Sequence, residues 1–232
     1  MSLTHVIDQD LSFHCVSNCA PIVFVVDNDI SVRESLDLLI CAQEWQAETF
    51  GSAQEFLARP RPLVPSCLVL DVSLPDLNAL DIQKRIAVER SGMPIIFISG
   101  GGDIRTTVEA MKAGAVDFLV KPVSNDVLLR SIRESLERSR AAVDREVALR
   151  DLQDCYALLT PRERQVMALV VSGLLNKQVA WELGIGETTV KAHRGQVMQK
   201  MKANSLPDLV KMASTLDPDT WRNSPGVGAA GA

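Results

Sequence analysis

The sequence contains no apolar run that approaches the roughly 18–20 residues needed for a membrane-spanning helix. Its start also lacks the basic flank and the short apolar core of a secretion signal. Of its 232 residues, 47% are apolar, which is ordinary for a soluble protein and sufficient for the cores of two domains. We therefore expect a cytoplasmic protein that does not associate with membranes.

Cysteines are odd in number and scattered, which argues against a disulfide framework. The five are Cys15, Cys19, Cys41, Cys67 and Cys155. Cys15 and Cys19 lie near His5 and His14, but their spacing is not that of a zinc motif and no second Cys/His pair follows. We expect no metal site in this segment.

The net charge of −5 conceals an asymmetry along the chain. Residues 1–120 hold 16 acidic and 8 basic residues, and residues 121–159 hold 7 of each. Residues 160–214 hold 8 basic and 4 acidic residues. An acidic half followed by a compact basic half indicates a regulatory domain joined to one that binds a polyanion.

Short apolar runs alternate with helical patterns in the first half of the chain. The predicted strands lie near residues 22–26, 47–50, 68–71, 94–98 and 116–120. Helices are predicted around residues 36–40 and 52–55 and over 77–88 and 104–113. This alternation predicts an α/β fold with a doubly wound, five-stranded parallel sheet and right-handed crossovers.

Polar residues follow the apolar runs of four of these strands. Asp71, considered alone, is equally well interpreted as a strand-end cap. A parallel sheet, however, brings Asp27 and Asn28, Asp71, Ser99 and Lys121 to one edge. Carboxylate oxygens there suit Mg²⁺, and Asp71 can act as a nucleophile that forms an acyl phosphate while Lys121 balances charge. The presence of all these residues at one edge favours a common phosphoryl-binding site over the alternative that each residue has a separate structural role at the end of its strand.

The second half of the chain reads as helical. Residues 124–158 contain no Gly or Pro and predict one long linker helix. Ser139 and Glu146 interrupt its apolar seam, so a strong coiled coil is not expected. Thr160-Pro161-Arg162-Glu163 then has the pattern of a capping box with proline at the first helical position.

Three further helices are predicted at residues 176–183, 187–201 and 206–215, with a tight Gly184-Ile185-Gly186 connection between the first two. Val190, Val197 and Met201 form an apolar stripe on the middle helix, and basic and amide side chains cover its other faces. Such a helix can enter the major groove of DNA. The alternative is an ordinary solvated helix face.

Residues 22–122 resemble the receiver domain of two-component response regulators. The resemblance implies a flavodoxin-like sheet of order 2-1-3-4-5 and a sensor histidine kinase that donates a phosphoryl group to Asp71. It makes Ser99 the switch hydroxyl and Lys121 the phosphate-binding lysine before a cis-prone proline. Phe118 holds the aromatic switch position, although a simple core phenylalanine is the alternative.

The same resemblance implies Mg²⁺ held by Asp27, Asn28, Asp71 and the backbone carbonyl of Ser73. Receivers usually carry two adjacent acids after the first strand, and here the second is the uncharged Asn28. Asp29 is expected to cap the next helix instead of replacing the missing ligand. We therefore predict weakened Mg²⁺ affinity and slower phosphorylation. A receiver that serves only as a phosphorylation-independent dimerisation module is the alternative.

Residues 160–214 resemble the LuxR-type helix–turn–helix domain of the NarL/FixJ class. The matching stretches are Leu159-Thr160-Pro161-Arg162-Glu163-Arg164-Gln165-Val166, Gly173-Leu174-Leu175-Asn176-Lys177-Gln178-Val179-Ala180 and Thr188-Thr189-Val190-Lys191-Ala192-His193-Arg194. The predicted DNA-binding residues are Lys177, Thr188, Thr189, Lys191, Ala192, Arg194 and Lys200. Thr188, Lys191 and Ala192 are expected at base edges, and Lys177, Arg194 and Lys200 at phosphates.

The predicted organisation is a flexible tail (1–20), a receiver domain (21–123), a linker helix (124–158), an all-α helix–turn–helix domain (159–216) and a disordered tail (217–232). This order resembles the FixJ-like regulators of styrene and toluene catabolism. It implies a bacterial transcription factor that binds promoter DNA. Phosphorylation would cause dimerisation or release of the DNA-binding domain, and RNA polymerase is an expected partner.

An enzyme is the remaining alternative, namely a phosphohydrolase with an aspartyl nucleophile. Such enzymes carry a second acid two residues after the nucleophile, where this chain has Ser73. We therefore expect no enzyme activity beyond the receiver's own phosphorylation and dephosphorylation.

Overall fold

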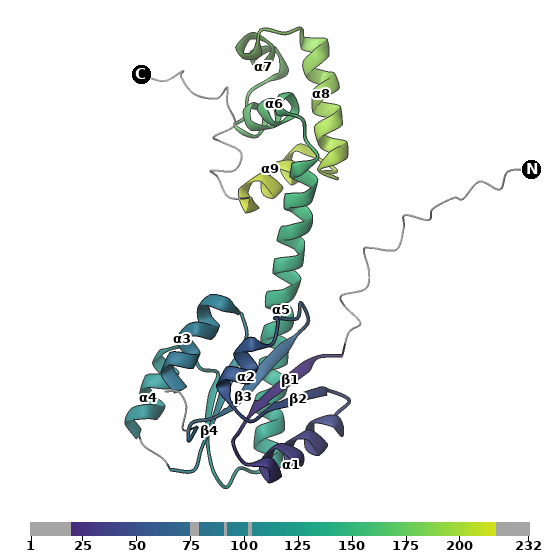
Figure 1. The fold of residues 1–232 in the computed structure, drawn as a ribbon. Coiled ribbons are helices and arrows are strands. Elements are labelled where there is room, and N and C mark those ends of the chain that lie inside the picture. The colour runs from purple at the N-terminus through teal and green to yellow at the C-terminus, as the bar shows by residue number, and fades with distance from the viewer. Residues whose placement is uncertain (1–19, 75–78, 91, 102–103, 217–232) are drawn as a thin grey trace, which may run out of the picture. The chain divides into compact units, whose positions relative to one another are not determined.

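The computed structural model describes residues 20–216 except 75–78, 91 and 102–103 (Figure 1). The predicted tails, apart from Ala20, and the segment with Cys15 and Cys19 lie outside the described residues. The chain divides into two compact units, Met1–Asp144 and Arg145–Ala232. Each unit has its own core.

The first unit alternates strands with helices. Its elements are β1 (Ile22–Val26), α1 (Ile30–Cys41), β2 (Gln46–Phe50), α2 (Ala53–Ala58), β3 (Ser66–Asp71), α3 (Ala79–Glu89), β4 (Ile95–Ser99), α4 (Ile104–Lys112) and β5 (Asp117–Val120). The strands form one parallel sheet of order β2-β1-β3-β4-β5, which confirms the predicted fold. The strand β3 begins earlier than predicted because Ser66 and Cys67 are also paired with β1.

Side chains of the strands alternate between the two faces of the sheet, and each face has its own apolar core. Helices α2, α3 and α4 cover one face, and α1 and α5 (Asn125–Ala157) cover the other. The buried helix residues are Phe56, Ile82, Ile86 and Ala110 on the first face and Ile40, Leu128, Ile132 and Leu136 on the second. Burial on both faces explains why the strands are continuous apolar runs.

The second unit is helical throughout its described part. Its core combines the last turns of α5 with α6 (Pro161–Val171), α7 (Asn176–Leu183), α8 (Glu187–Lys200) and α9 (Leu206–Thr215). The predicted capping box closes α6, because the Thr160 side chain accepts from the Glu163 N–H and the Glu163 carboxylate accepts from the Thr160 N–H. Gly184 ends α7 in the left-handed region with φ 63°, where glycine carries no steric penalty.

The long helix α5 has 33 residues, which agrees with the single helix predicted over 124–158. The division between the two units falls within it, after Asp144. Within the described part of the chain, no helix combines the length and the apolar character needed to cross a bilayer.

Replacing Phe56 with alanine should lower the free energy of unfolding of the first unit by about 3–5 kcal/mol. The ring is fully buried and packs 5.4 Å from Phe24 and 5.7 Å from Phe50, with the Arg90 guanidinium 4.2 Å from its centroid. Urea unfolding of the full chain measures the change. Leu38→Ala, at a site 73% exposed, is the control and should cost little. A loss below about 1 kcal/mol for Phe56→Ala would contradict this packing.

Candidate functional site

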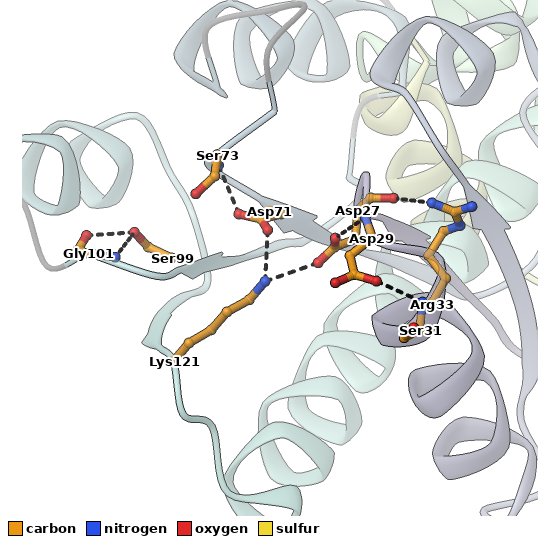
Figure 2. Close-up of polar contacts among 9 residues, drawn as sticks. All are labelled: Asp27, Asp29, Ser31, Arg33, Asp71, Ser73, Ser99, Gly101 and Lys121. Carbon is orange, nitrogen blue, oxygen red and sulfur yellow. Dashed lines mark hydrogen bonds and ion pairs between the residues drawn. The ribbon is translucent and has the colours of Figure 1, made fainter.

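The C-terminal ends of the central strands lie at one edge of the sheet (Figure 2). Val26 of β1 is paired with Leu70 of β3, so the next residues, Asp27 and Asp71, lie at the same height along the sheet. Asp71 is in turn paired with Ile98 of β4, the residue before Ser99. Asp27 therefore emerges beside Asp71. Both carboxylates are buried, with only 4% and 6% of their residues exposed.

A single ammonium group holds the two carboxylates together. Lys121 Nζ lies 2.8 Å from Asp71 Oδ2 and 3.1 Å from Asp27 Oδ2 (Figure 2). The second oxygen of each carboxylate accepts a backbone hydrogen bond, from the N–H of Ser73 to Asp71 and from the N–H of Asp29 to Asp27. Two acids thus share one base, and this small cluster keeps a net negative charge.

The environment keeps both partners ionised. Burial alone would raise the pKa of Asp71, but hydrogen bonds from Lys121 and Ser73 outweigh it and hold the pKa below its ordinary value. Burial likewise opposes the charge of Lys121, yet Asp71 and Asp27 raise its pKa above the ordinary value. At neutral pH Asp71 is therefore an anion, which is the form a nucleophilic oxygen requires.

The oxygen atoms at this edge fit Mg²⁺. Asp27 and Asp71 supply two carboxylates, and the exposed Asn28 and the backbone carbonyl of Ser73 supply neutral oxygens of the type that Mg²⁺ accepts. Asp29 does not add a third carboxylate, because it caps α1 by accepting a hydrogen bond from the Ser31 N–H, as predicted. Since no group of three or more His, Cys, Asp or Glu side chains suited to a metal is found among the described residues, an ion at this edge would depend on the neutral oxygens as well as on the two carboxylates.

Neither of the predicted switch residues is hydrogen-bonded to Asp71 within the described part of the chain. Ser99 Oγ donates to the carbonyl of Gly101 at 2.6 Å and accepts from its N–H, so the hydroxyl is engaged within its own loop. Phe118 is half-buried and packs 6.3 Å from Phe97 beside the apolar core. The peptide bond between Lys121 and Pro122 is cis, as the resemblance implied.

Helix α8 presents a second group of candidate residues. Val190 and Val197 are buried against the rest of the second unit, together with Met201 just after the helix. The predicted base-reading residues Thr188, Lys191 and Ala192 are exposed, and so is Thr189, which was predicted to bind DNA without an assigned contact. The stripe of apolar residues thus orients α8 so that its first turns face outward.

Two of the residues predicted to contact phosphates have partners within the protein. Lys200 Nζ lies 2.7 Å from the buried carboxylate of Glu163, and Arg194 donates to Asn176 Oδ1 at 3.1 Å. Lys177 is exposed at the start of α7. The pair of Lys200 with Glu163 was not predicted, because the two residues are 37 positions apart and the capping box alone accounted for the glutamate.

The chain matches two protein families. Residues 23–133 match the family described as "Response regulator receiver domain", and residues 157–213 match "Bacterial regulatory proteins, luxR family". Nodulation protein W of Bradyrhizobium diazoefficiens is 49% identical, over 88% of this chain and 89% of that protein. The transcriptional regulatory protein FixJ of the same organism is 39% identical, over 82% of this chain and 93% of FixJ.

A solved structure extends this likeness to three dimensions. The response regulator StyR is 42% identical, with a TM-score of 0.76 over 84% of this chain and 99% of the StyR chain. The resemblance described from the sequence is thereby confirmed for both halves of the chain.

Replacing Lys200 with methionine should destabilise the second unit at neutral pH by about 1–3 kcal/mol, because it leaves a buried carboxylate without its cation. Burial raises the pKa of Glu163, but Lys200 and Thr160 outweigh it, so the pKa lies below the ordinary value. The Lys200–Glu163 pair therefore stabilises the fold at pH values above the ordinary glutamate pKa, and this stabilisation is lost as the pH falls through the lowered pKa of Glu163. The difference in stability between Lys200→Met and the wild-type protein should therefore become smaller at acidic pH.

Thermal unfolding of the full chain between neutral and acidic pH measures this effect. Lys191→Met is the matched control, because Lys191 lies on the same helix with 65% of its side chain exposed. A deficit of Lys200→Met that stays constant with pH would contradict the assignment.

Proposed function

Because this chain belongs to the bacterial response regulators that join a receiver domain to a LuxR-type DNA-binding domain, we propose that phosphorylation of Asp71 controls its binding to promoter DNA. Membership itself makes the protein a regulator of transcription and not a classical enzyme, with a sensor kinase and DNA as partners. The observation that carries the proposal is the ammonium of Lys121 between Asp71 and Asp27.

The chemistry at Asp71 is phosphoryl transfer from a phosphohistidine of the kinase. A carboxylate oxygen of Asp71 bonds to phosphorus while the phosphorus–nitrogen bond breaks, and the electron pair of that bond returns to the imidazole. Lys121 is already in place to face the charge of the phosphoryl oxygens. Mg²⁺, held by Asp27, Asn28, Asp71 and the Ser73 carbonyl, would add positive charge there.

The response to phosphorylation begins at Ser99 in this proposal. Its hydroxyl leaves Gly101 and donates to a phosphoryl oxygen, and Phe118 moves with it beside the core. The surface formed by α4 and β5 then changes shape. Dimerisation or release of the DNA-binding domain follows, and contact with RNA polymerase completes the output.

At the promoter, helix α8 enters the major groove. Thr188, Lys191 and Ala192 are exposed on its first turns and face base edges, with the exposed Thr189 beside them, while Lys177 reaches a phosphate. Arg194 and Lys200 hold helix α8 in place through their contacts with Asn176 and Glu163, and their positive charges also attract the phosphates of DNA.

A second candidate is a receiver that works without phosphorylation. The neutral Asn28 favours it, together with the fact that Lys121 already balances part of the charge of both carboxylates. In that case the receiver serves as a dimerisation module, and Asp71 is a structural acid.

Replacing Asp71 with asparagine separates the two candidates. Asparagine keeps an oxygen for the Ser73 N–H but cannot form an acyl phosphate. Wild-type protein treated with acetyl phosphate should gain at least about fivefold in promoter affinity, and Asp71→Asn should show neither phosphoryl uptake nor gain. Footprinting with and without acetyl phosphate measures affinity, and Asp126→Asn, at an exposed position in the first turn of helix α5, is the control. Equal footprints for wild type and Asp71→Asn under both conditions would support the second candidate.

Replacing Asn28 with aspartate should tighten Mg²⁺ binding about tenfold, because a neutral oxygen becomes a third carboxylate close to the ion. Calorimetric titration of the full chain with MgCl₂ measures the dissociation constant. Asn204→Asp adds the same charge at an exposed site in the second unit and serves as the control. An unchanged dissociation constant for Asn28→Asp would exclude Asn28 from the metal site.

A further inference from the structure

The strand that carries Asp71 makes a second polar contact at its other end. The N–H of Ser66, the first residue of β3, donates to Ser139 Oγ of α5 at 2.9 Å. Both residues are buried, with 4% and 2% exposed. A buried backbone N–H without a partner is costly, so Ser139 supplies an acceptor that β3 requires. One strand thus joins Asp71 to α5.

Ser139 belongs to a row of buried serines on α5. Ser131, Ser135 and Ser139 recur at every fourth position beside the row of apolar residues that packs against the sheet. Ser131 donates to Asp117, the first residue of β5, through a side chain that can adjust. Ser135 Oγ has no hydrogen-bond partner within the described structure. Ser139 therefore differs from the other two, because its partner is the backbone of a strand.

The same helix continues into the core of the second unit. Leu152 and Tyr156 of α5 pack there with residues of α6, α8 and α9. Close packing on the first unit extends past Ser139, because a Cβ added at Gly92 would lie only 2.9 Å from the Cβ of Ala142. The Ser139 contact thus lies on the stretch of α5 that leads towards the DNA-binding unit.

We propose that Ser139 is a positioning residue that couples β3, and with it the phosphorylation state of Asp71, to helix α5. The inference rests on the proposed function. β3 is hydrogen-bonded to β1 and β4, so a displacement at Asp71 is transmitted to Ser66, about 16 Å away along the strand, through a backbone that extends little. Coupling between two sites is reciprocal. If phosphorylation of Asp71 changes the strength of the bond between Ser66 and Ser139, then removing that bond must change the response of the protein to phosphorylation.

The test compares three variants of the full chain. Ser139→Ala removes the hydroxyl that accepts from the Ser66 N–H, and Ser139→Thr keeps a hydroxyl there. Ser135→Ala, one helical turn earlier, removes a buried hydroxyl that has no hydrogen-bond partner in the described structure. Phosphoryl uptake from acetyl phosphate and promoter affinity with and without it are measured for each. Ser139→Ala should take up phosphoryl at the wild-type level but keep less than about one fifth of the gain in affinity. Ser135→Ala and Ser139→Thr should keep most of that gain.

The outcomes separate the inference from the function on which it rests. A wild-type gain in Ser139→Ala overturns the role of Ser139 and leaves the proposed function intact. Wild-type protein without phosphoryl uptake, or without any gain, overturns both.

A second measurement decides the case in which Ser139→Ala does not fold. Hydrogen exchange of the Ser66 amide is followed in wild-type protein with and without beryllofluoride, a phosphoryl mimic. Protection of this amide should change at least about fivefold, because the bond contributes differently in the two states. Unchanged protection overturns the inference.

Discussion

The ammonium group of Lys121 is the contact on which the first unit depends. It lies between two carboxylates that are almost fully buried, and each of those carboxylates would be costly without it. The three side chains come from the ends of β1, β3 and β5, so the arrangement exists only when the parallel sheet is complete. The charge balance is also incomplete, with two acids for one base. An added cation is therefore compatible with this edge, and a phosphoryl group there meets a lysine already in position.

The long helix α5 has contacts in both units of the chain. Its first half forms part of the apolar core of the receiver, and its last turns form part of the core of the DNA-binding unit. Between these parts the helix binds the beginning of β3 through Ser139. Any change that repositions β3 therefore acts on a helix that belongs to both cores. A flexible linker would have no comparable contact.

The DNA-binding unit uses its charges in two ways. Lys200 and Arg194 have internal partners, and these hold the C-terminal part of α8 against α6 and the middle of α8 against the start of α7. Thr188, Lys191 and Ala192 remain exposed at the start of α8. The division follows the geometry of the helix, because the buried stripe turns its later basic residues towards neighbouring helices. Counting basic residues on α8 overstates the charge available to DNA.

The sequence by itself determined the parallel sheet and the order of elements, because apolar runs, capping residues and glycine stops are local signals. The resemblance to the two families came from particular residues at strand ends and from motifs of the second half. It also predicted that Asp27, Asp71, Ser99 and Lys121 share an edge, since parallel strands place their carboxyl ends together. Only the tertiary structure decided which of these side chains touch. It paired Lys121 with both acids, turned Ser99 towards Gly101, and joined Ser139 to Ser66 and Lys200 to Glu163. Those contacts depend on side-chain directions and on residues far apart in the chain, which local periodicity does not encode.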